Sequence, residues 1–248
     1  TAVALAAELH ADVCEIYTDV DGVYTADPRI VPNARKMEEV TYDEMLEMAS
    51  LGAKVLHSRC VEIAKKYGVE LLVCSSLNRN SGTMVREKTK MEKMLISGVA
   101  ADKNVAKIRV AGLGNDPEST FRLLNLLDRN NLNIDVMIQS LGKDGTKSVS
   151  FTVAKPDMLR TIDVLNDNKD SLGIKKLDYD ENVAKISVIG AGVRSHSGVA
   201  AKMFGALANA GINTEMITTS EIRITALIDE AYADQAMRAI HETFLERV

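Results

Sequence analysis

Hydrophobic residues in the first part of the chain follow helical and strand-like periods in turn. Helices are expected over 1–9, about 41–50 and 53–67, and strands over 13–18 and 69–75. Thr41 and Glu44 fit a capping box, in which the hydroxyl and the carboxylate each satisfy an amide that lacks a partner at a helix start. Gly68 is placed to end the last of these helices. Strands that alternate with helices predict an α/β unit with a parallel sheet.

The second half of the chain contains an internal repeat. Residues 104–110 (NVAKIRV) recur as 182–188 (NVAKISV), identical at six of seven positions, and a Gly-x-Gly run follows each copy. In the first copy, strands are expected over 105–111, 133–140, 147–154 and 173–178, and helices over 117–130 and 156–167. This order is the βαββαβ unit of ferredoxin-like folds.

The second copy repeats the first five elements and lacks the sixth strand. An open sheet edge invites association, so we expect a strand over 94–101 to fill it, which makes the first repeat an insertion within the second. The predicted fold class is α/β, with a partial parallel-sheet domain followed by two ferredoxin-like (βαββαβ) domains. The expected bounds are 1–90 for the first, 103–179 for the second, and 91–102 with 180–248 for the third.

Composition and charge exclude several classes of protein. The 248 residues include 30 Lys or Arg and 35 Asp or Glu, a net charge of -5, so neither nucleic acid nor a membrane is an expected partner. No stretch approaches the roughly 20 apolar residues that span a bilayer, and no leader-like segment opens the chain, so we expect a cytoplasmic protein. Cys14, Cys60 and Cys74 are odd in number and widely spaced, which favours packed thiols over a disulfide or a metal site.

The loop from Thr18 to Arg29 carries the first candidate chemistry. It follows the carboxyl end of a predicted strand, where open α/β sheets bind ligands, and it contains three carboxylates and Tyr24. The ring of Tyr24 suits a base, Arg29 can hold a phosphate through two hydrogen bonds, and the carboxylates suit ribose hydroxyls or a magnesium shell. A solvated turn is the alternative.

Lys54 stands near the expected start of the helix over 53–67. Exposed amides at a helix start already favour an anion, so a lysine there suits phosphate. A surface lysine is the alternative. His57 nearby is expected to be a hydrogen-bonded structural residue rather than a base.

Three segments together resemble aspartokinase, a family of amino-acid kinases that ends in two ACT domains. They are 19–29 (DVDGVYTADPR), 44–57 (EMLEMASLGAKVLH) and 219–224 (TSEIRI). The resemblance runs in order along essentially the whole chain. It implies that 1–90 is the carboxyl part of the kinase domain and that the two ferredoxin-like units are ACT domains. The implied reaction is ATP-dependent phosphorylation of L-aspartate to 4-phospho-L-aspartate.

The resemblance also assigns roles to single residues. The nucleotide site implied by the family's motifs comprises Thr18, Asp19, Tyr24, Arg29, Lys54 and Val55. ATP with Mg²⁺ is then a substrate, and no tightly bound cofactor or metal is expected. The family's Lys-Phe-Gly-Gly and Gly-Arg-Gly-Gly-Ser-Asp-Thr stretches do not occur in this sequence. We therefore expect no catalytic residue within these 248 residues and no activity from them alone.

ACT domains bind amino acids, which implies feedback regulation by lysine, threonine or both. The candidate effector residues are Asn115, Asp116, Asn133, Ile134, Asp135 and Gln139 in the first copy, and Asn213, Thr214, Glu215, Thr219, Ser220 and Glu221 in the second. Helix-start amides suit the effector carboxylate, and acidic side chains suit its ammonium group. The alternative is that Asn133 and Asn213 merely end turns.

ACT domains also pair with one another, so a homodimer or higher oligomer is expected. Two other functions stay open, a non-catalytic regulatory subunit and a stand-alone amino-acid sensor. A sensor would leave Tyr24, Arg29 and Lys54 without a role.

Overall fold

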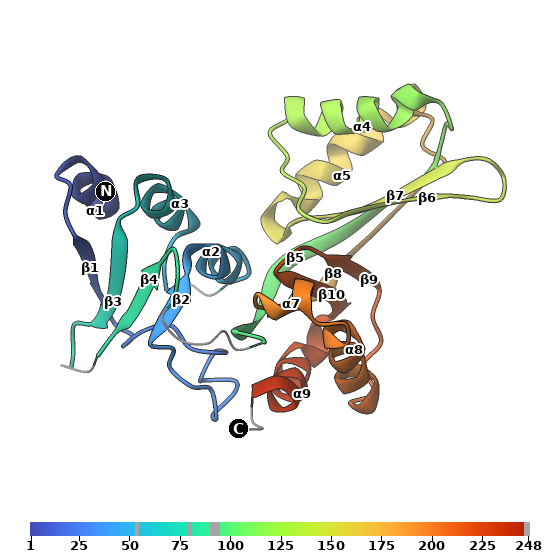
Figure 1. Ribbon diagram of the computed structural model, residues 1–248. Coiled ribbons are helices and arrows are strands. Elements are labelled where there is room, and N and C mark those ends of the chain that lie inside the picture. Colours follow the sequence, from blue (N-terminus) through green and yellow to red (C-terminus); the bar gives the residue numbers. More distant parts are fainter. Residues whose placement is uncertain (53–54, 79–80, 90–94, 246–248) are drawn as a thin grey trace. The chain divides into compact units, whose positions relative to one another are not determined.

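The computed structural model describes residues 1–52, 55–78, 81–89 and 95–245 (Figure 1). The chain forms two compact units. The first unit comprises 1–102, 185–228 and 232–248, and the second comprises 103–184 and 229–231. The α/β class predicted from the sequence is confirmed, because both units combine helices with sheets.

The amino-terminal sheet has the strand order β1-β3-β4-β2. Its strands are β1 (Val13–Thr18), β2 (Glu39–Thr41), β3 (Glu70–Ser75) and β4 (Thr83–Arg86). The two predicted strands, β1 and β3, pair in parallel, as expected. The short strands β2 and β4 were not predicted. Because β4 runs antiparallel to β3, the sheet is mixed.

Three helices accompany this sheet: α1 (Ala2–Glu8), α2 (Tyr42–Ser50) and α3 (Ser58–Tyr67). Their apolar faces share one aliphatic core with the strands, in which Met45, Val61, Leu71 and Val73 are fully buried. The capping box of α2 is confirmed, since the Thr41 side chain accepts from the Glu44 amide and the Glu44 carboxylate accepts from the Thr41 amide. The α2 start is therefore fixed by local chemistry.

The start of α3 was predicted wrongly. The helix begins at Ser58, not at 53, and His57 caps it by accepting a hydrogen bond from the Arg59 amide at Nδ1. Gly52, two residues after the end of α2, has a left-handed φ of +97°, which glycine adopts without strain. A Cβ at Gly52 would lie 2.9 Å from the Ala101 carbonyl oxygen. The predicted end is correct, with Gly68 in the left-handed conformation.

The second unit contains the strand order β6-β7-β5-β8. Its elements are β5 (Gly98–Leu113), α4 (Pro117–Arg129), β6 (Met137–Leu141), β7 (Lys147–Ala154), η1 (Lys155–Asp157), α5 (Met158–Asp167), α6 (Lys169–Leu172) and β8 (Lys176–Ile189), with the first residues of β5 and the last of β8 in the first unit. The strand predicted from 133 begins only at Met137. The preceding residues are held irregularly, with the Asp135 and Val136 amides both bonded to Thr152.

The first unit also contains the carboxyl-terminal elements. These are α7 (Gly192–Ser195), α8 (Val199–Asn209), β9 (Met216–Thr219), β10 (Arg223–Asp229), η2 (Glu230–Tyr232, partly in the second unit) and α9 (Ala233–Leu245), and the strand order is β5-β8-β10-β9. β5 is unbroken from 98 to 113, so the separate strands predicted over 94–101 and 105–111 are one. Its first part lies next to β8: the amide of Ser97, directly before β5, donates to the Ile189 carbonyl, and Asp102 pairs with Lys185.

Within the described part of the chain, no helix is long and apolar enough to cross a membrane. The three cysteines are free thiols. Burial is the main cause that raises the pKa of the Cys14 thiol, and the nearby Cys60 adds to it.

Candidate functional site

The loop after β1 starts at the carboxyl edge of the parallel strands. The Thr18 carbonyl accepts hydrogen bonds from the Ser76 amide, at 2.8 Å, and from Ser76 Oγ, at 3.0 Å. These bonds tie the first residue of the loop to the chain that leaves β3. Thr18 Oγ1 donates to the Asp19 carboxylate at 3.0 Å. The predicted pair Thr18 and Asp19 therefore lies at the edge where open α/β sheets bind ligands.

Tyr24 is held by a carboxylate on the same loop. Its hydroxyl donates to Asp21 Oδ1 at 2.8 Å, and Lys36 Nζ lies 3.5 Å from the other oxygen of Asp21. The bond to Asp21 is the main cause that raises the pKa of Tyr24, with burial second. Tyr24 also forms an antiparallel bridge with Lys36. Lys36 was not singled out from the sequence, because it joins the site only when the loop returns.

Arg29 is an exposed cation at the tip of the loop. Its guanidinium pairs with Asp27 at 2.6 Å, while 87% of the Arg29 side chain remains exposed. This pairing lowers the pKa of the Asp27 carboxyl and raises the pKa of Arg29, to which Asp19 also contributes. The Asp19 carboxylate thus lies within electrostatic range of Arg29. Tyr24 and Arg29 lie on one loop, and each is bonded to a different carboxylate.

The structure describes one of the remaining two residues predicted for this site, Val55, but not the other, Lys54. Val55 is partly buried and packs against the aliphatic core of the first unit. Lys54 lies outside the described residues. Thr83 joins this loop to the segment that returns from it, because its buried Oγ1 accepts from the Val23 amide and donates to the Met37 carbonyl. Nothing in the sequence pattern identified Thr83, since it is distant in the chain and lies on an unpredicted strand.

In the first repeat, Asp116 caps α4. Its Oδ1 accepts from the Glu118 amide at 3.0 Å, and Arg122 lies 3.6 Å from the same oxygen. The amide at this helix start is therefore already bonded to a carboxylate. Gln139 Oε1 accepts from Thr120 Oγ1 on the same helix at 2.7 Å. The other candidates are exposed or packed: Asn115, Asn133 and Asp135 are exposed, and Ile134 packs on the core.

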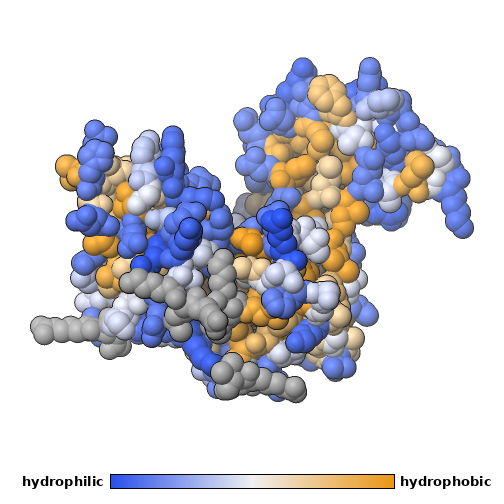
Figure 2. Space-filling model, viewed as in Figure 1, coloured by the Kyte–Doolittle hydropathy of each residue, from blue (hydrophilic) through white to orange (hydrophobic). Residues whose placement is uncertain are grey.

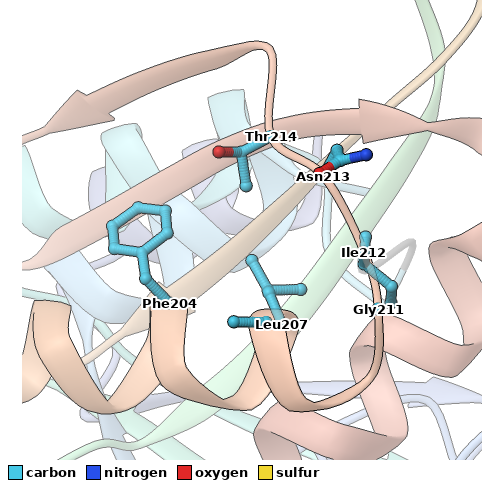
Figure 3. A pocket seen from close by; sticks show the side chains of 7 residues that line it. Phe204, Leu207, Gly211, Ile212, Asn213 and Thr214 are labelled. Atoms are coloured by element: carbon cyan, nitrogen blue, oxygen red, sulfur yellow. The ribbon is translucent and has the colours of Figure 1, made fainter.

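In the second repeat, Asn213 and Thr214 line a pocket of about 330 Å³ at the end of α8 (Figure 3). Phe204 and Leu207 of α8 form its apolar side. α8 begins at Val199, at the end of the helix away from this pocket, and its N-cap Gly198 supplies no side-chain hydrogen bond. The pocket therefore combines apolar surface with polar groups of the 211–214 loop.

The other candidates of this repeat lie along β9. Glu215 precedes the strand, and its amide donates to the Leu227 carbonyl at 2.8 Å. Thr219 ends the strand, and Ser220 donates from its amide to the Arg223 carbonyl. Glu221 pairs with Arg194 at 3.0 Å, with both side chains largely exposed. The predicted set thus lies at both ends of β9 rather than at one point.

Comparisons with known proteins agree with both halves of this description. The amino acid kinase family model matches residues 1–75, and an ACT domain model matches residues 186–244. The regulatory subunit of aspartate kinase from Thermus thermophilus is 33% identical, with a TM-score of 0.57, and this chain covers 99% of it. The chain belongs to the aspartokinase family. The loop with Tyr24 and Arg29 lies in the segment that matches the kinase family, and the pocket with Asn213 lies in the one that matches the ACT domain.

Longer aspartokinases match nearly the whole chain. The aspartokinase of Pseudomonas aeruginosa is 45% identical over 247 residues, which is 98% of this chain and 60% of that relative. Aspartokinase III of E. coli, solved in complex with aspartate and ADP in an R-state, is 29% identical, with a TM-score of 0.86, over 98% of this chain and 54% of that one. The same enzyme was solved with lysine and aspartate in a T-state. This chain therefore spans about 60% of the length of its curated relative.

Proposed function

We propose that this aspartokinase chain is part of an enzyme that transfers the γ-phosphoryl group of ATP to L-aspartate and forms 4-phospho-L-aspartate. The observation that carries the proposal is the loop of 18–29, which starts at the carboxyl edge of the β1–β3 pair and presents Tyr24 and Arg29. Phosphoryl transfer depends on positioning and charge neutralisation more than on covalent chemistry. A positioned ring and a cation on one loop suit those demands. The E. coli relative bound to ADP and aspartate supports the same ligands.

Within this site, Thr18, Asp19, Tyr24, Arg29, Lys54 and Val55 contact the nucleotide. Arg29 now pairs with Asp27, and a phosphate competes for the same guanidinium donors. Nucleotide binding therefore exchanges one anion for another at Arg29, which keeps the cation paired in both states. Magnesium arrives with ATP as part of the substrate. Within the described residues, no group of three or more potential ligand side chains forms a metal site.

For the domains we propose the bounds that the sequence predicts. Residues 1–90 form the carboxyl part of the kinase domain, 103–179 form the first ACT domain, and 91–102 with 180–248 form the second. The aspartate pocket and part of the phosphate site then require residues other than these, so the 248 residues alone form no aspartyl phosphate. This chain covers 60% of the P. aeruginosa relative, which supports a need for residues beyond these 248.

Lysine, threonine or both regulate the enzyme through the second ACT domain. Its pocket at 211–214 is lined by apolar side chains of α8 and by polar groups of the loop that follows this helix. In the first ACT domain, Asp116 caps α4, so the helix-start amide is already bonded to a carboxylate. An effector shifts the enzyme only through a different affinity for two states, typically by 1–3 kcal/mol. The lysine-bound T-state of the E. coli relative supports such a pair of states.

The chain associates with further copies through its ACT domains. β6 is an edge strand whose residues are all exposed, and Met137, Ile138 and Leu141 supply apolar side chains there. Figure 2 shows apolar patches among polar residues on the unit that carries β6. An exposed apolar edge is a natural pairing surface.

The enzyme is expected in the cytoplasm.

The test is an assay of aspartyl phosphate formation, trapped as the hydroxamate, with the complete enzyme and with the 248 residues alone. We expect ATP- and aspartate-dependent product from the complete enzyme, with inhibition by lysine or threonine, and none from the shorter chain. Product from the 248 residues alone would refute the division proposed above. Absence of product from the complete enzyme would refute the reaction.

A non-catalytic regulatory subunit is the second candidate. The Thermus regulatory subunit supports it, because it aligns with 60% of this chain over nearly its own full length. The rest of the chain favours the kinase, since residues 1–75 match the amino acid kinase family. Binding of Mg·ADP that depends on Tyr24 distinguishes the two, because a purely regulatory chain has no use for that residue.

A further inference from the structure

The carboxyl-terminal helix α9 contacts the loop that carries Tyr24 and Arg29. Thr25 follows Tyr24 directly and is 2% exposed, and its Oγ1 lies 2.9 Å from Nε2 of the fully buried His241 on α9. Thr25 Oγ1 also accepts the Arg35 amide hydrogen at 3.0 Å, so its own hydroxyl hydrogen can be donated to Nε2. Since both groups lie away from water, separating them is costly.

Thr25 is also the point where three segments meet. Its amide donates to the Arg35 carbonyl at 2.9 Å, which joins the outgoing and returning arms of the loop. Its carbonyl accepts from the Val99 amide at 2.8 Å, at the start of β5. A displacement of Thr25 therefore moves the backbone on which Tyr24 stands.

Two more hydrogen bonds join α9 to this loop. Arg35 Nη2 donates to the Leu245 carbonyl at 2.5 Å, and Arg238 Nη1 lies 3.5 Å from the Ile30 carbonyl, next to Arg29. Together with the bond from His241 to Thr25, these contacts reach both the loop itself and the segment of 30–35 that returns from it. The loop thus rests on α9 at several points, and His241 provides the buried one.

The opposite end of α9 is bonded to the segment that forms the pocket of the second ACT domain. Gln235 Nε2 donates to the Ala210 carbonyl at 3.2 Å, directly before the 211–214 loop that lines the pocket. α8, which supplies Phe204 to the pocket, packs against α9. From Gln235 to His241 the helix advances about 9 Å, at 1.5 Å per residue. One rigid element therefore joins the pocket to the nucleotide loop.

We propose that α9 transmits occupancy of the 211–214 pocket to the loop of Tyr24 and Arg29 through the His241–Thr25 hydrogen bond. This inference rests on the proposed function, which supplies the amino-acid effector and the nucleotide. An effector that binds more tightly to one position of α9 than to another favours that position. The loop then changes its conformation, because Thr25 must either move with His241 or lose its buried hydrogen bond to His241. His241 acts here as a positioning residue and touches neither ligand.

The first test measures hydrogen exchange of the amides in 22–37 in the chain without ligands. His241→Ala should raise their exchange about tenfold, the ratio expected for one lost buried hydrogen bond, and leave β1 and β3 unchanged. His241→Gln keeps a side-chain group that can bond Thr25 and should restore most of the protection. Glu242→Ala, at the exposed neighbouring position, is the matched control. Unchanged exchange in His241→Ala would overturn the proposal.

The second test adds lysine or threonine at saturation, with binding measured by isothermal titration. In the wild-type chain the effector should change exchange in 22–37, and in His241→Ala it should bind with similar affinity and leave the loop unaffected. Thr25→Val removes the same bond from the loop side and should behave like His241→Ala. If neither amino acid binds, the effector role and this inference both fail. If an effector binds and the wild-type loop does not respond, or the loop of His241→Ala still responds, only this inference fails.

Discussion

Replacement of Glu44 tests how the kinase segment is joined to the strand that leads into the ACT domains. Glu44 is buried, with 6% of the residue exposed. Its Oε2 accepts from the Thr41 amide at 3.1 Å and from Thr41 Oγ1 at 2.7 Å. Its Oε1 accepts from Ser97 Oγ at 2.6 Å. One carboxylate thus completes the cap of α2 and holds the segment before β5.

The expected cost follows from these bonds. Glu44→Ala leaves both the Thr41 amide and the Ser97 hydroxyl without their acceptor, at about 1–1.5 kcal/mol each. We therefore expect a loss of about 2–3 kcal/mol in the free energy of unfolding, or roughly 5–10 °C in Tm for a chain of this size. Glu44→Gln keeps an acceptor for Thr41 and offers a donor to Ser97, so it should cost less than half as much.

Urea unfolding followed by circular dichroism, with thermal scans beside it, measures both variants. Glu47 on the same helix supplies a comparison, because it pairs with Arg223 at 2.8 Å and has no part in the cap. A loss below about 1 kcal/mol for Glu44→Ala, measured against the value of one cap, would refute the reasoning. An equal loss in Glu44→Gln would also refute it, since it would show that charge rather than hydrogen bonding matters.

Three further predictions concern the loop of Tyr24 and Arg29 and the repeat. Asp21→Asn should lower the pKa of Tyr24 toward its ordinary value, because the bond to the Asp21 carboxylate is the main cause of the raised pKa; NMR titration of ring-labelled tyrosine would show this, and an unchanged pKa would contradict it. Arg29→Ala should raise the pKa of Asp27, because the bond to Arg29 is the main cause of its lowered value. The pair therefore stabilises the folded loop at pH values above the ordinary carboxyl pKa, and this stabilisation is lost as the pH falls through the pKa of Asp27 in the folded chain. NMR titration of the Asp27 carboxyl measures this pKa, and an unchanged value would contradict the prediction. Gly190→Ala should destabilise the first unit by about 1–3 kcal/mol, as overpacking does, because a Cβ there would lie 2.7–2.9 Å from backbone atoms of the segment before β5; a stable variant would mean that this segment yields easily.

Elements fixed by neighbouring residues were predictable from the sequence. β1 and β7 have the predicted bounds, and the capping box of α2 forms as expected, because each depends on side chains a few positions apart. The start of α3 was missed because its cap, His57, is not among the residue types that usually mark a helix start. Strand continuity in β5 was also missed; β7 pairs with only its second part, from Val105.

The candidate site shows the same division. Its loop was identified from residue types, yet the groups that hold it, Thr83 and His241, come from distant segments. The bond between Thr25 and His241 joins residues 216 positions apart. No local pattern reports such a contact, because it exists only once the ACT domain has folded against the kinase segment.

The central claim is that the loop of Tyr24 and Arg29 binds ATP for phosphoryl transfer to aspartate. Steady-state kinetics of the complete enzyme with Arg29→Ala test it most directly, with Lys66→Ala, an exposed lysine on α3, as the control. The account predicts that the KM for ATP rises about tenfold or more, the usual effect of losing a charge-assisted phosphate contact, while the KM for aspartate changes less than about twofold. An unchanged KM for ATP, or an equal rise for both substrates, would contradict it.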